Sequence, residues 1–353
     1  MNPIVLGPNQ IRRFYRGGAA IARFRGVPGE GDHAPEDWVG SATSVFGEER
    51  LGRSVLPDGR TATEAFAADP EAFFGPRHAD RFGADPGLLV KLLDAGERLP
   101  VHCHPDREFA RRHLNCPYGK TEAWVILEIR SSDAGVFLGF GHDVELGTLA
   151  TWVGGQDTSA VLAAMNRIPV AVGDAVLVPA GVPHAIGEGV FLVELQEPTD
   201  LSVLLEWKGF DIDVARDGQL GLGFDQTLRC ADRSAWNERR LARLHARRPD
   251  GRGVRPGVDA LFPHEADPFF RAERIRTRDA ALLPASFSIL VTTEGRGRLE
   301  YDGGALDVRR GTTVLVPFAM GDCRLVATRD AVEGVRCMPP DTGAPEVSTP
   351  ILR

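Results

Sequence analysis

The sequence has few cysteines, and their positions do not suit a cross-linked fold. The 353 residues include five, with no two in a CxxC pattern: Cys103, Cys116, Cys230, Cys323 and Cys337. A disulfide framework needs an even set of cysteines, and a structural zinc site of thiolates needs closely spaced ones. Neither is predicted here, and a reducing compartment is expected.

Long apolar runs are also missing. Nowhere do about 18 apolar residues follow one another without a charge, which is the length a membrane helix needs. The first residues, MNPIVLGPNQIRRFYRGG, lack the apolar core of a secretion signal. We therefore expect a cytoplasmic protein with no membrane partner.

The chain has no excess of positive charge. It contains 41 Lys and Arg against 49 Asp and Glu, which gives a net charge of −8. Binding to nucleic acid depends largely on clusters of Lys and Arg, so no nucleic-acid partner is expected. The one basic run, ERRLARLHARR at 238–248, lies in a predicted helix and is typical of a solvated helix face.

What the chain does have is a series of short β-type runs, broken by Gly, Pro and Asp. Strands are predicted at 136–140, 175–180, 190–196, 201–207, 287–295, 297–304, 305–311 and 313–318. Helical periodicity is clearest at 61–74, 157–168 and 234–248. A mostly β chain of this kind favours a barrel or sandwich architecture, and its length suits two or three packed units.

A weak internal repeat supports two β-units. The segment VGDAVLVPAGVPH ends at His184, and RGTTVLVPFAMGD ends at Asp322. Each has a glycine (Gly173, Gly311) followed after five residues by a proline. If the two copies are homologous, only the first has kept a metal-binding histidine.

Histidines and a carboxylate gather in and after the segment VHCHPD. His102 and His104 are two residues apart, so on a strand both side chains leave the same face. Lys120 and Glu122 follow in GKTEAWVIL, and His184 comes from another strand. Three imidazoles and one carboxylate suit Zn²⁺, Mn²⁺, Fe²⁺ or Ni²⁺. An HxH pair alone is a weak signal, because core or surface histidines also produce it.

The segment GDAVLVPAGVPH has the pattern of the second cupin signature, G-x5-PxG-xx-H. More closely, LLVKLLDAGERLPVHCHPDREFARRHLNCPYGKTEAWVIL and VPAGVPHAIGEGVFLVELQ resemble the type I mannose-6-phosphate isomerases, as does FRGVPGEGDHAPEDWVGS. The resemblance covers most of the chain. It implies two cupin (jelly-roll) β-barrels in tandem with small helical insertions: a metal-binding domain at 1–246, a linker at 247–268 and a domain without metal ligands at 269–353.

The resemblance also implies roles for single residues. It places metal ligands at His104, Glu122 and His184, with His102 where the family has a glutamine. Lys91 in LVKLLD and Lys120 in GKTE match lysines near the family's active site and are expected to act in catalysis.

The implied activity is a metal-dependent aldose–ketose isomerisation of mannose 6-phosphate and fructose 6-phosphate or a related sugar, with zinc as the first choice of metal. Such a reaction moves a proton between C1 and C2 through an enediolate, whose charge a divalent cation can stabilise. The proton-transferring base stays open among His113, Glu194 and a water on the metal.

Three departures from the family pattern bear on the substrate. The family has Ser at Pro100, Gln at His102, and an arginine after the strand that here reads ELQEPTDLSVLLEW. Arginine suits phosphate because of its bidentate geometry, so its absence weakens the case for a phosphorylated sugar. The alternatives are an isomerase or epimerase of an unphosphorylated sugar and a catalytically silent sugar-binding regulator. In every case the expected partner is a small-molecule sugar or sugar phosphate.

Overall fold

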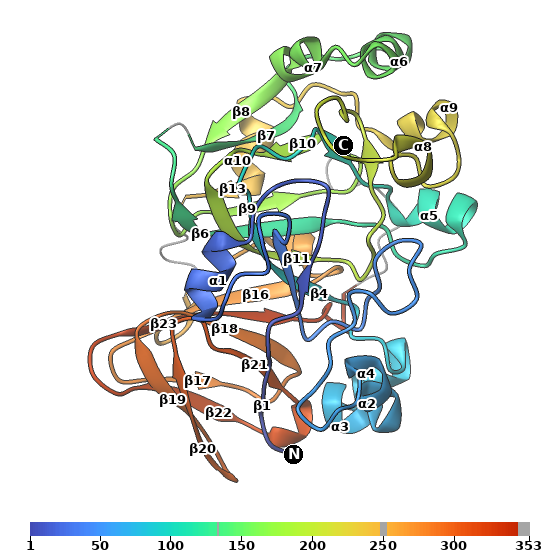
Figure 1. The fold of residues 1–353 in the computed structure, drawn as a ribbon. Coiled ribbons are helices and arrows are strands. Elements are labelled where there is room, and N and C mark those ends of the chain that lie inside the picture. Colours follow the sequence, from blue (N-terminus) through green and yellow to red (C-terminus); the bar gives the residue numbers. More distant parts are fainter. Residues whose placement is uncertain (133, 248–252, 345–353) are drawn as a thin grey trace.

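The computed structural model describes residues 1–132, 134–247 and 253–344. Its strands form four sheets, which make two units, each with one seven-stranded sheet and one smaller sheet. In Figure 1 most strands of the first unit (cyan to green) lie above most strands of the second (orange to red).

The first unit contains a seven-stranded sheet in the order β13-β9-β6-β11-β4-β3-β2 and a five-stranded sheet in the order β12-β5-β10-β7-β8. The bounds in the larger sheet are β2 (Gln10–Ile11), β3 (Glu36–Val39), β4 (Leu89–Asp94), β6 (Glu122–Ile129), β9 (Ala175–Val178), β11 (Val190–Gln196) and β13 (His245–Ala246). Those in the smaller sheet are β5 (His102–Cys103), β7 (Gly135–Phe140), β8 (Met165–Pro169), β10 (His184–Ile186) and β12 (Val203–Leu204).

The second unit has sheets in the orders β1-β21-β18-β23-β16-β15-β14 and β17-β22-β19-β20. The bounds in its larger sheet are β1 (Ile4–Val5), β14 (Gly253–Arg255), β15 (Val258–Ala260), β16 (Arg271–Thr277), β18 (Ser288–Glu294), β21 (Thr313–Val316) and β23 (Val332–Met338). Those in its smaller sheet are β17 (Ala280–Leu283), β19 (Arg296–Tyr301), β20 (Gly304–Arg309) and β22 (Cys323–Ala327).

Helices are short and lie around the sheets. They are α1 (Ala19–Arg25), α2 (Ala62–Ala68), α3 (Pro70–Phe74), α4 (Pro76–Phe82), α5 (Arg107–Leu114), α6 (Leu146–Gly155), α7 (Thr158–Ala164), α8 (Val214–Asp217), α9 (Phe224–Thr227) and α10 (Glu238–Leu244), with 3₁₀ turns η1 (Leu228–Cys230), η2 (His264–Ala266) and η3 (Phe318–Met320). Among the described residues, no helix combines the length and apolar character needed to cross a membrane.

The predicted helices are present, but their bounds differ from the prediction. The helix predicted at 61–74 is two helices, because Asp69 caps the first turn of α3 and Pro70 occupies its first position. The helix predicted at 157–168 ends at Ala164, since the chain continues as β8 and pairs with β7. The strand predicted at 201–207 is confined to β12.

Two findings qualify the predicted division into domains, which stays a prediction. β1 lies at the start of the chain yet pairs with β21 of the second unit, Ile4 opposite Leu315. Within the stretch 247–268, expected as a linker, β14 and β15 pair with each other, and β15 pairs with β16. The second unit therefore draws strands from both sides of the predicted boundary.

The repeat corresponds to similar turns in the two units. Gly173 before β9 and Gly311 before β21 have φ values of 90° and 87°, a region that favours glycine. At Gly311 a Cβ atom would lie 1.9 Å from the carbonyl oxygen of Phe24, so the chains approach too closely for a side chain.

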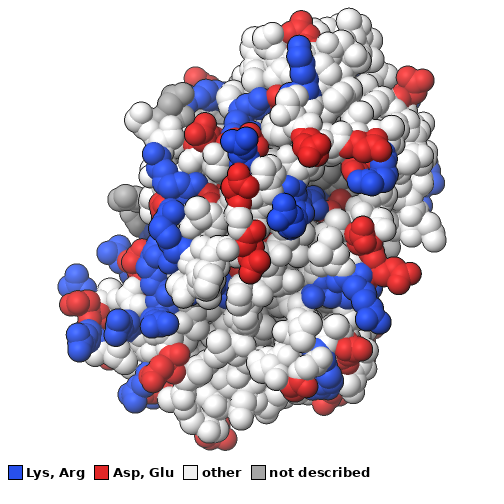
Figure 2. Space-filling model, viewed as in Figure 1, with Lys and Arg blue, Asp and Glu red and all other residues white. Residues whose placement is uncertain are grey.

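The central strands of the first unit carry polar side chains into its interior. Every residue of β4 and β11 is buried, including Lys91 on β4 and Glu194 on β11. Buried polar groups need partners, so these residues must belong to a network. On the outer face in Figure 2, by contrast, basic and acidic side chains are interspersed over most elements.

Candidate metal centre and active-site pocket

Three imidazoles converge on the inner side of the five-stranded sheet. β10 pairs with β5 so that His184 lies opposite His102, and His104 follows two residues later. The ring centroids are 4.2 Å apart for His102 and His184, and 4.8 Å for His104 and His184. One ligand nitrogen from each lies within 4.8 Å of the others, the spacing of a metal site.

Backbone carbonyls fix the orientation of all three rings. The Nδ1 atom of His102 donates to the carbonyl of Pro100 at 2.8 Å, that of His104 to Leu201 at 2.7 Å, and that of His184 to Val182 at 2.8 Å. Each imidazole therefore carries a proton on Nδ1 and turns Nε2 toward the cluster. Such outer hydrogen bonds are typical of metal-binding histidines. The buried Nε2 of His184 has no hydrogen-bond partner.

Glu122, the first residue of β6, completes the cluster. Its carboxylate oxygens lie 3.1 Å from Nε2 of His104 and 3.2 Å from Nε2 of His184. Trp124 Nε1 donates to the same carboxylate at 3.1 Å, and Lys120 Nζ donates to it at 2.6 Å. Lys120 Nζ also donates to His104 Nε2 at 2.9 Å.

The protonation states suit a cation. Burial lowers the pKa of His104 to about 3, with Lys120 adding to the effect. Burial and the two neighbouring imidazoles likewise hold the pKa of His102 well below its usual value. Burial opposes ionisation of Glu122, but Lys120, His184 and His104 together keep its pKa well below the usual range. Neutral imidazoles at His102 and His104 beside an ionised carboxylate are donors that a divalent transition metal takes.

A pocket of about 560 Å³ opens beside this cluster. Its wall includes His102, Glu122, Lys120, Lys91 and Glu194, so both predicted lysines border one space with the predicted ligands. Lys120 Nζ lies 3.6 Å from the Glu194 carboxylate. Burial raises the pKa of Glu194 to about 8. A carboxyl group with a pKa near neutrality is suited to general acid–base chemistry.

A second polar cluster, centred on Glu36 of β3, was not predicted from the sequence. Its carboxylate accepts hydrogen bonds from the Tyr15 hydroxyl and from Trp38 Nε1, the latter at 2.6 Å. It also forms ion pairs with Lys91 at 3.2 Å and with Arg13 at 3.3 Å. Burial opposes ionisation of Glu36, but Arg13 and Lys91 hold its pKa well below the usual range. Glu36 thus fixes the Lys91 ammonium group at the pocket.

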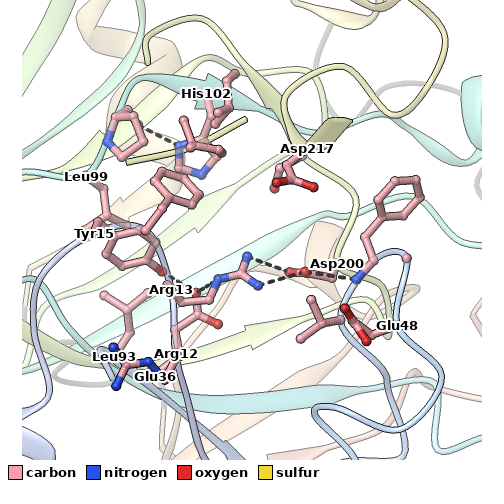
Figure 3. A pocket seen from close by; sticks show the side chains of 18 of the residues that line it. Arg12, Arg13, Tyr15, Glu36, Glu48, Leu93, Leu99, His102, Asp200 and Asp217 are labelled. Carbon is pink, nitrogen blue, oxygen red and sulfur yellow. Dashed lines mark hydrogen bonds and ion pairs between the residues drawn. The ribbon is translucent and has the colours of Figure 1, made fainter. Parts of the chain in front are cut away.

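The sequence offered only a faint signal for this cluster. Acidic side chains in the strand-like segment PEDWV are unusual at buried positions, and Glu36 and Asp37 are both buried. Their partners come from distant segments, which no local pattern identifies. Figure 3 shows the guanidinium of Arg13 pointing into the pocket between Glu36 and Asp200.

Two further expectations can be placed in the structure. His113, one candidate for the base, lies on α5 beside Gln226, with 3.1 Å between His113 Nε2 and Gln226 Nε2, and does not line the pocket. The segment after β11, where an arginine was missing, contributes Asp200, Ser202 and Leu204 to the pocket wall. The wall there carries no positive charge of its own.

Comparisons with known proteins agree with this architecture. The mannose-6-phosphate isomerase ManA of Bacillus subtilis (strain 168) is 32% identical over 318 residues, which span 88% of this chain and 91% of that protein. The crystal structure of the mannose 6-phosphate isomerase from Bacillus subtilis superposes with a TM-score of 0.74 at 22% identity, covering 96% of this chain and 99% of the other. No protein-family model matches the chain.

A third protein bears on the metal. A mannose 6-phosphate isomerase whose structure contains zinc and yttrium superposes with a TM-score of 0.70 at 14% identity, covering 97% of this chain and 100% of that one. At this identity the likeness shows the fold alone. Together the comparisons confirm the prediction of a mostly β fold of the cupin type.

Proposed function

The chain belongs to the mannose-6-phosphate isomerase family, and on that premise we propose that it interconverts mannose 6-phosphate and fructose 6-phosphate at the pocket beside the three imidazoles. The observation that carries the proposal is that His102, His104 and His184 bring their ligand nitrogens together, with the Glu122 carboxylate close to two of them, at the edge of a pocket that also holds two lysines. The small molecule that fits this chemistry is a sugar phosphate.

His102, His104, Glu122 and His184 would hold a divalent cation. The fit is supported by the unpartnered Nε2 of His184 and by the backbone hydrogen bonds that aim the three rings. Zn²⁺ is the first choice because it accepts imidazole and carboxylate ligands and because a structural neighbour contains it. Mn²⁺, Fe²⁺ and Ni²⁺ accept the same donors. When bound, the cation polarises the sugar carbonyl and stabilises negative charge on the enediolate.

The residues of the chain supply the proton transfer. Glu194 lines the pocket, and its pKa of about 8 in the metal-free protein lies close to neutrality, so we assign it as the group that carries the proton between C1 and C2. A divalent cation bound by the neighbouring ligands would favour the carboxylate form of Glu194, which is the form that removes a proton.

The two lysines stabilise developing negative charge. In the metal-free protein Lys120 donates to Glu122 and His104, the same acceptors that a cation would take. Once those acceptors are occupied, its ammonium group is free to donate to a substrate oxygen. Lys91 lies opposite Glu194 on the neighbouring strand β4, on the side of β11 away from β6, and is held there by its ion pair with Glu36. The pocket thus offers positive charge on both sides of the proton carrier.

The test is isotope exchange with the zinc-loaded protein. Incubation of mannose 6-phosphate in deuterated water should give fructose 6-phosphate, and deuterium should appear at C1 or C2 because the transferred proton exchanges with solvent at the base. Nuclear magnetic resonance of the sugar phosphates measures both. Mannose 6-phosphate that remains unconverted and unlabelled with fully zinc-loaded protein would rule the proposal out.

The two alternatives raised from the sequence are not favoured. The named relatives are isomerases of mannose 6-phosphate, which argues against a silent regulator and against an unphosphorylated substrate. The metal's identity, the cytoplasmic location and the lack of a nucleic-acid partner stay predictions.

A further inference from the structure

The pocket contains five basic side chains, and four of them are already neutralised. Arg13 forms two hydrogen bonds to Asp200, at 3.1 and 3.3 Å, in addition to its ion pair with Glu36. Lys91 is held by Glu36 at 3.2 Å, and Lys120 by Glu122 at 2.6 Å. Arg13 is therefore already paired, and the two lysines lie beside the imidazole cluster and Glu194, where they serve the reacting end of the sugar rather than its phosphoryl group.

Arg216 of α8 is also a poor site for an anion. It pairs with Asp217, and two further acids, Asp213 and Glu48, act on the same guanidinium. Asp211 adds another acidic side chain to this wall of the pocket. A phosphate dianion brought to Arg216 would meet several carboxylates at close range, and like charges repel.

Arg12 differs from the other four cations. It follows β2, lines the pocket and is exposed. Among residues 1–132, 134–247 and 253–344, its side chain forms no ion pair and no hydrogen bond. Figure 3 shows Arg12 with Leu93 and Glu36 on one side of the pocket, and Asp200, Asp217 and Glu48 on the other side. Glu36 is already paired with Arg13 and Lys91, so the pocket has an acidic side and a side on which Arg12 is the cation without a partner among the described residues.

The segment after β11 lacks the arginine that the family has there, and Arg12 offers a positive charge at another place in the same pocket. Leu204 and Ser202 line the pocket there, so that segment cannot bind a dianion by charge. The guanidinium of Arg12 comes from a distant segment and supplies five N–H donors in a geometry that matches phosphate. Building on the proposed function, we propose that Arg12 binds the phosphoryl group of the sugar phosphate and thereby sets the specificity for phosphorylated substrates.

The test compares zinc-loaded wild type with Arg12→Gln and with Arg216→Gln, which removes a matched arginine from the acidic side. For Arg12→Gln we expect KM for mannose 6-phosphate to rise about 10-fold to 100-fold, the range for one lost charge-assisted contact, with kcat nearly unchanged. Arg216→Gln should change KM by less than about threefold. Arg12→Lys should recover part of the loss, because it restores the charge without the bidentate geometry.

Inorganic phosphate gives a second measurement on the same proteins. As a competitive inhibitor it should bind more weakly to Arg12→Gln by about the same factor as the substrate, about 10-fold to 100-fold. An active wild type combined with unchanged KM and unchanged phosphate inhibition in Arg12→Gln would overturn the assignment of Arg12 and leave the isomerase proposal standing. A wild type that does not convert mannose 6-phosphate would overturn both.

Discussion

Replacing His184 with alanine tests the metal centre directly, because this residue contributes to the site but little to the metal-free fold. Its Nε2 atom is buried and has no hydrogen-bond partner, so the metal-free variant loses only the bond from Nδ1 to Val182 and the packing of the ring. We expect the free energy of unfolding of the metal-free protein to fall by about 1–2 kcal/mol. The large effect should appear only when a metal is added.

The size of that effect follows from the number of ligands. Binding of zinc to four-ligand sites contributes about 10–16 kcal/mol, so one ligand of four accounts for about 3 kcal/mol, or roughly a 100-fold rise in Kd. A metal at 100 times its Kd stabilises the wild type by about 2.7 kcal/mol. At the same metal concentration, His184→Ala would gain only about 0.4 kcal/mol.

Chemical denaturation with and without zinc measures both quantities, and elemental analysis after dialysis measures the bound metal. His78→Ala is the matched control, since His78 is also buried and its Nε2 is bonded to the carbonyl of Asp85 at 2.7 Å. The His78 variant should be less stable without metal but should keep the full zinc-induced gain. A His184 variant with the same zinc-induced gain as wild type would refute the assignment of His184 as a ligand.

Three further substitutions test other parts of the site. Lys120→Ala should keep its metal and lose about 100-fold to 1000-fold in kcat, whereas the exposed control Lys208→Ala should match wild type; equal turnover in both would place Lys120 outside the chemistry. Glu194, with its pKa raised to about 8, binds a proton in the folded state that the unfolded chain has released, so its contribution to stability is present at low pH and is lost as pH rises through about 8. In metal-free Glu194→Gln this loss should be absent when urea unfolding is compared at about pH 6 and pH 9, and an unchanged pH dependence would contradict the raised pKa of Glu194. Gly181 has φ +86°, and an added Cβ would lie 2.9 Å from the carbonyl oxygen of Cys230, so Gly181→Ala should lower the free energy of unfolding by about 1–3 kcal/mol. The control Gly209→Ala has a similar φ but open space around the Cβ, so it should lower that free energy less. Equal losses in the two variants would show that the backbone at Gly181 shifts to make room for the side chain.

Part of the histidine cluster could be predicted from the sequence because its geometry is local, while the ligand roles stay predictions. The two-residue spacing of His102 and His104 determines that both face one side of a strand, and the turn before His184 places that residue at a strand start. Such relations depend on the period of the strand alone. Lys120 and Glu122 are two residues apart in the next strand-like segment, and their roles were implied by the resemblance to the isomerase family.

The Glu36 cluster could not be predicted in the same way. Asp200 meets Arg13 across 187 residues of sequence, and Lys91 meets Glu36 across two neighbouring strands. These contacts depend on the order of strands in the sheet, which the hydrophobic pattern of each strand does not encode. The position of His113 outside the pocket wall could not be predicted for the same reason, because it depends on how α5 packs.

The pairing of β1 with β21 has a consequence for how the protein is made. Ile4 is synthesised long before Leu315, the residue opposite it, so the growing polypeptide must hold this short segment without its partner while nearly the whole second unit is still being translated. β21 otherwise forms the edge of its sheet, and an uncovered edge is a template for pairing with other chains. β1 therefore covers the edge of β21 only after the second unit has been synthesised, and removal of β1 would favour self-association through the exposed edge.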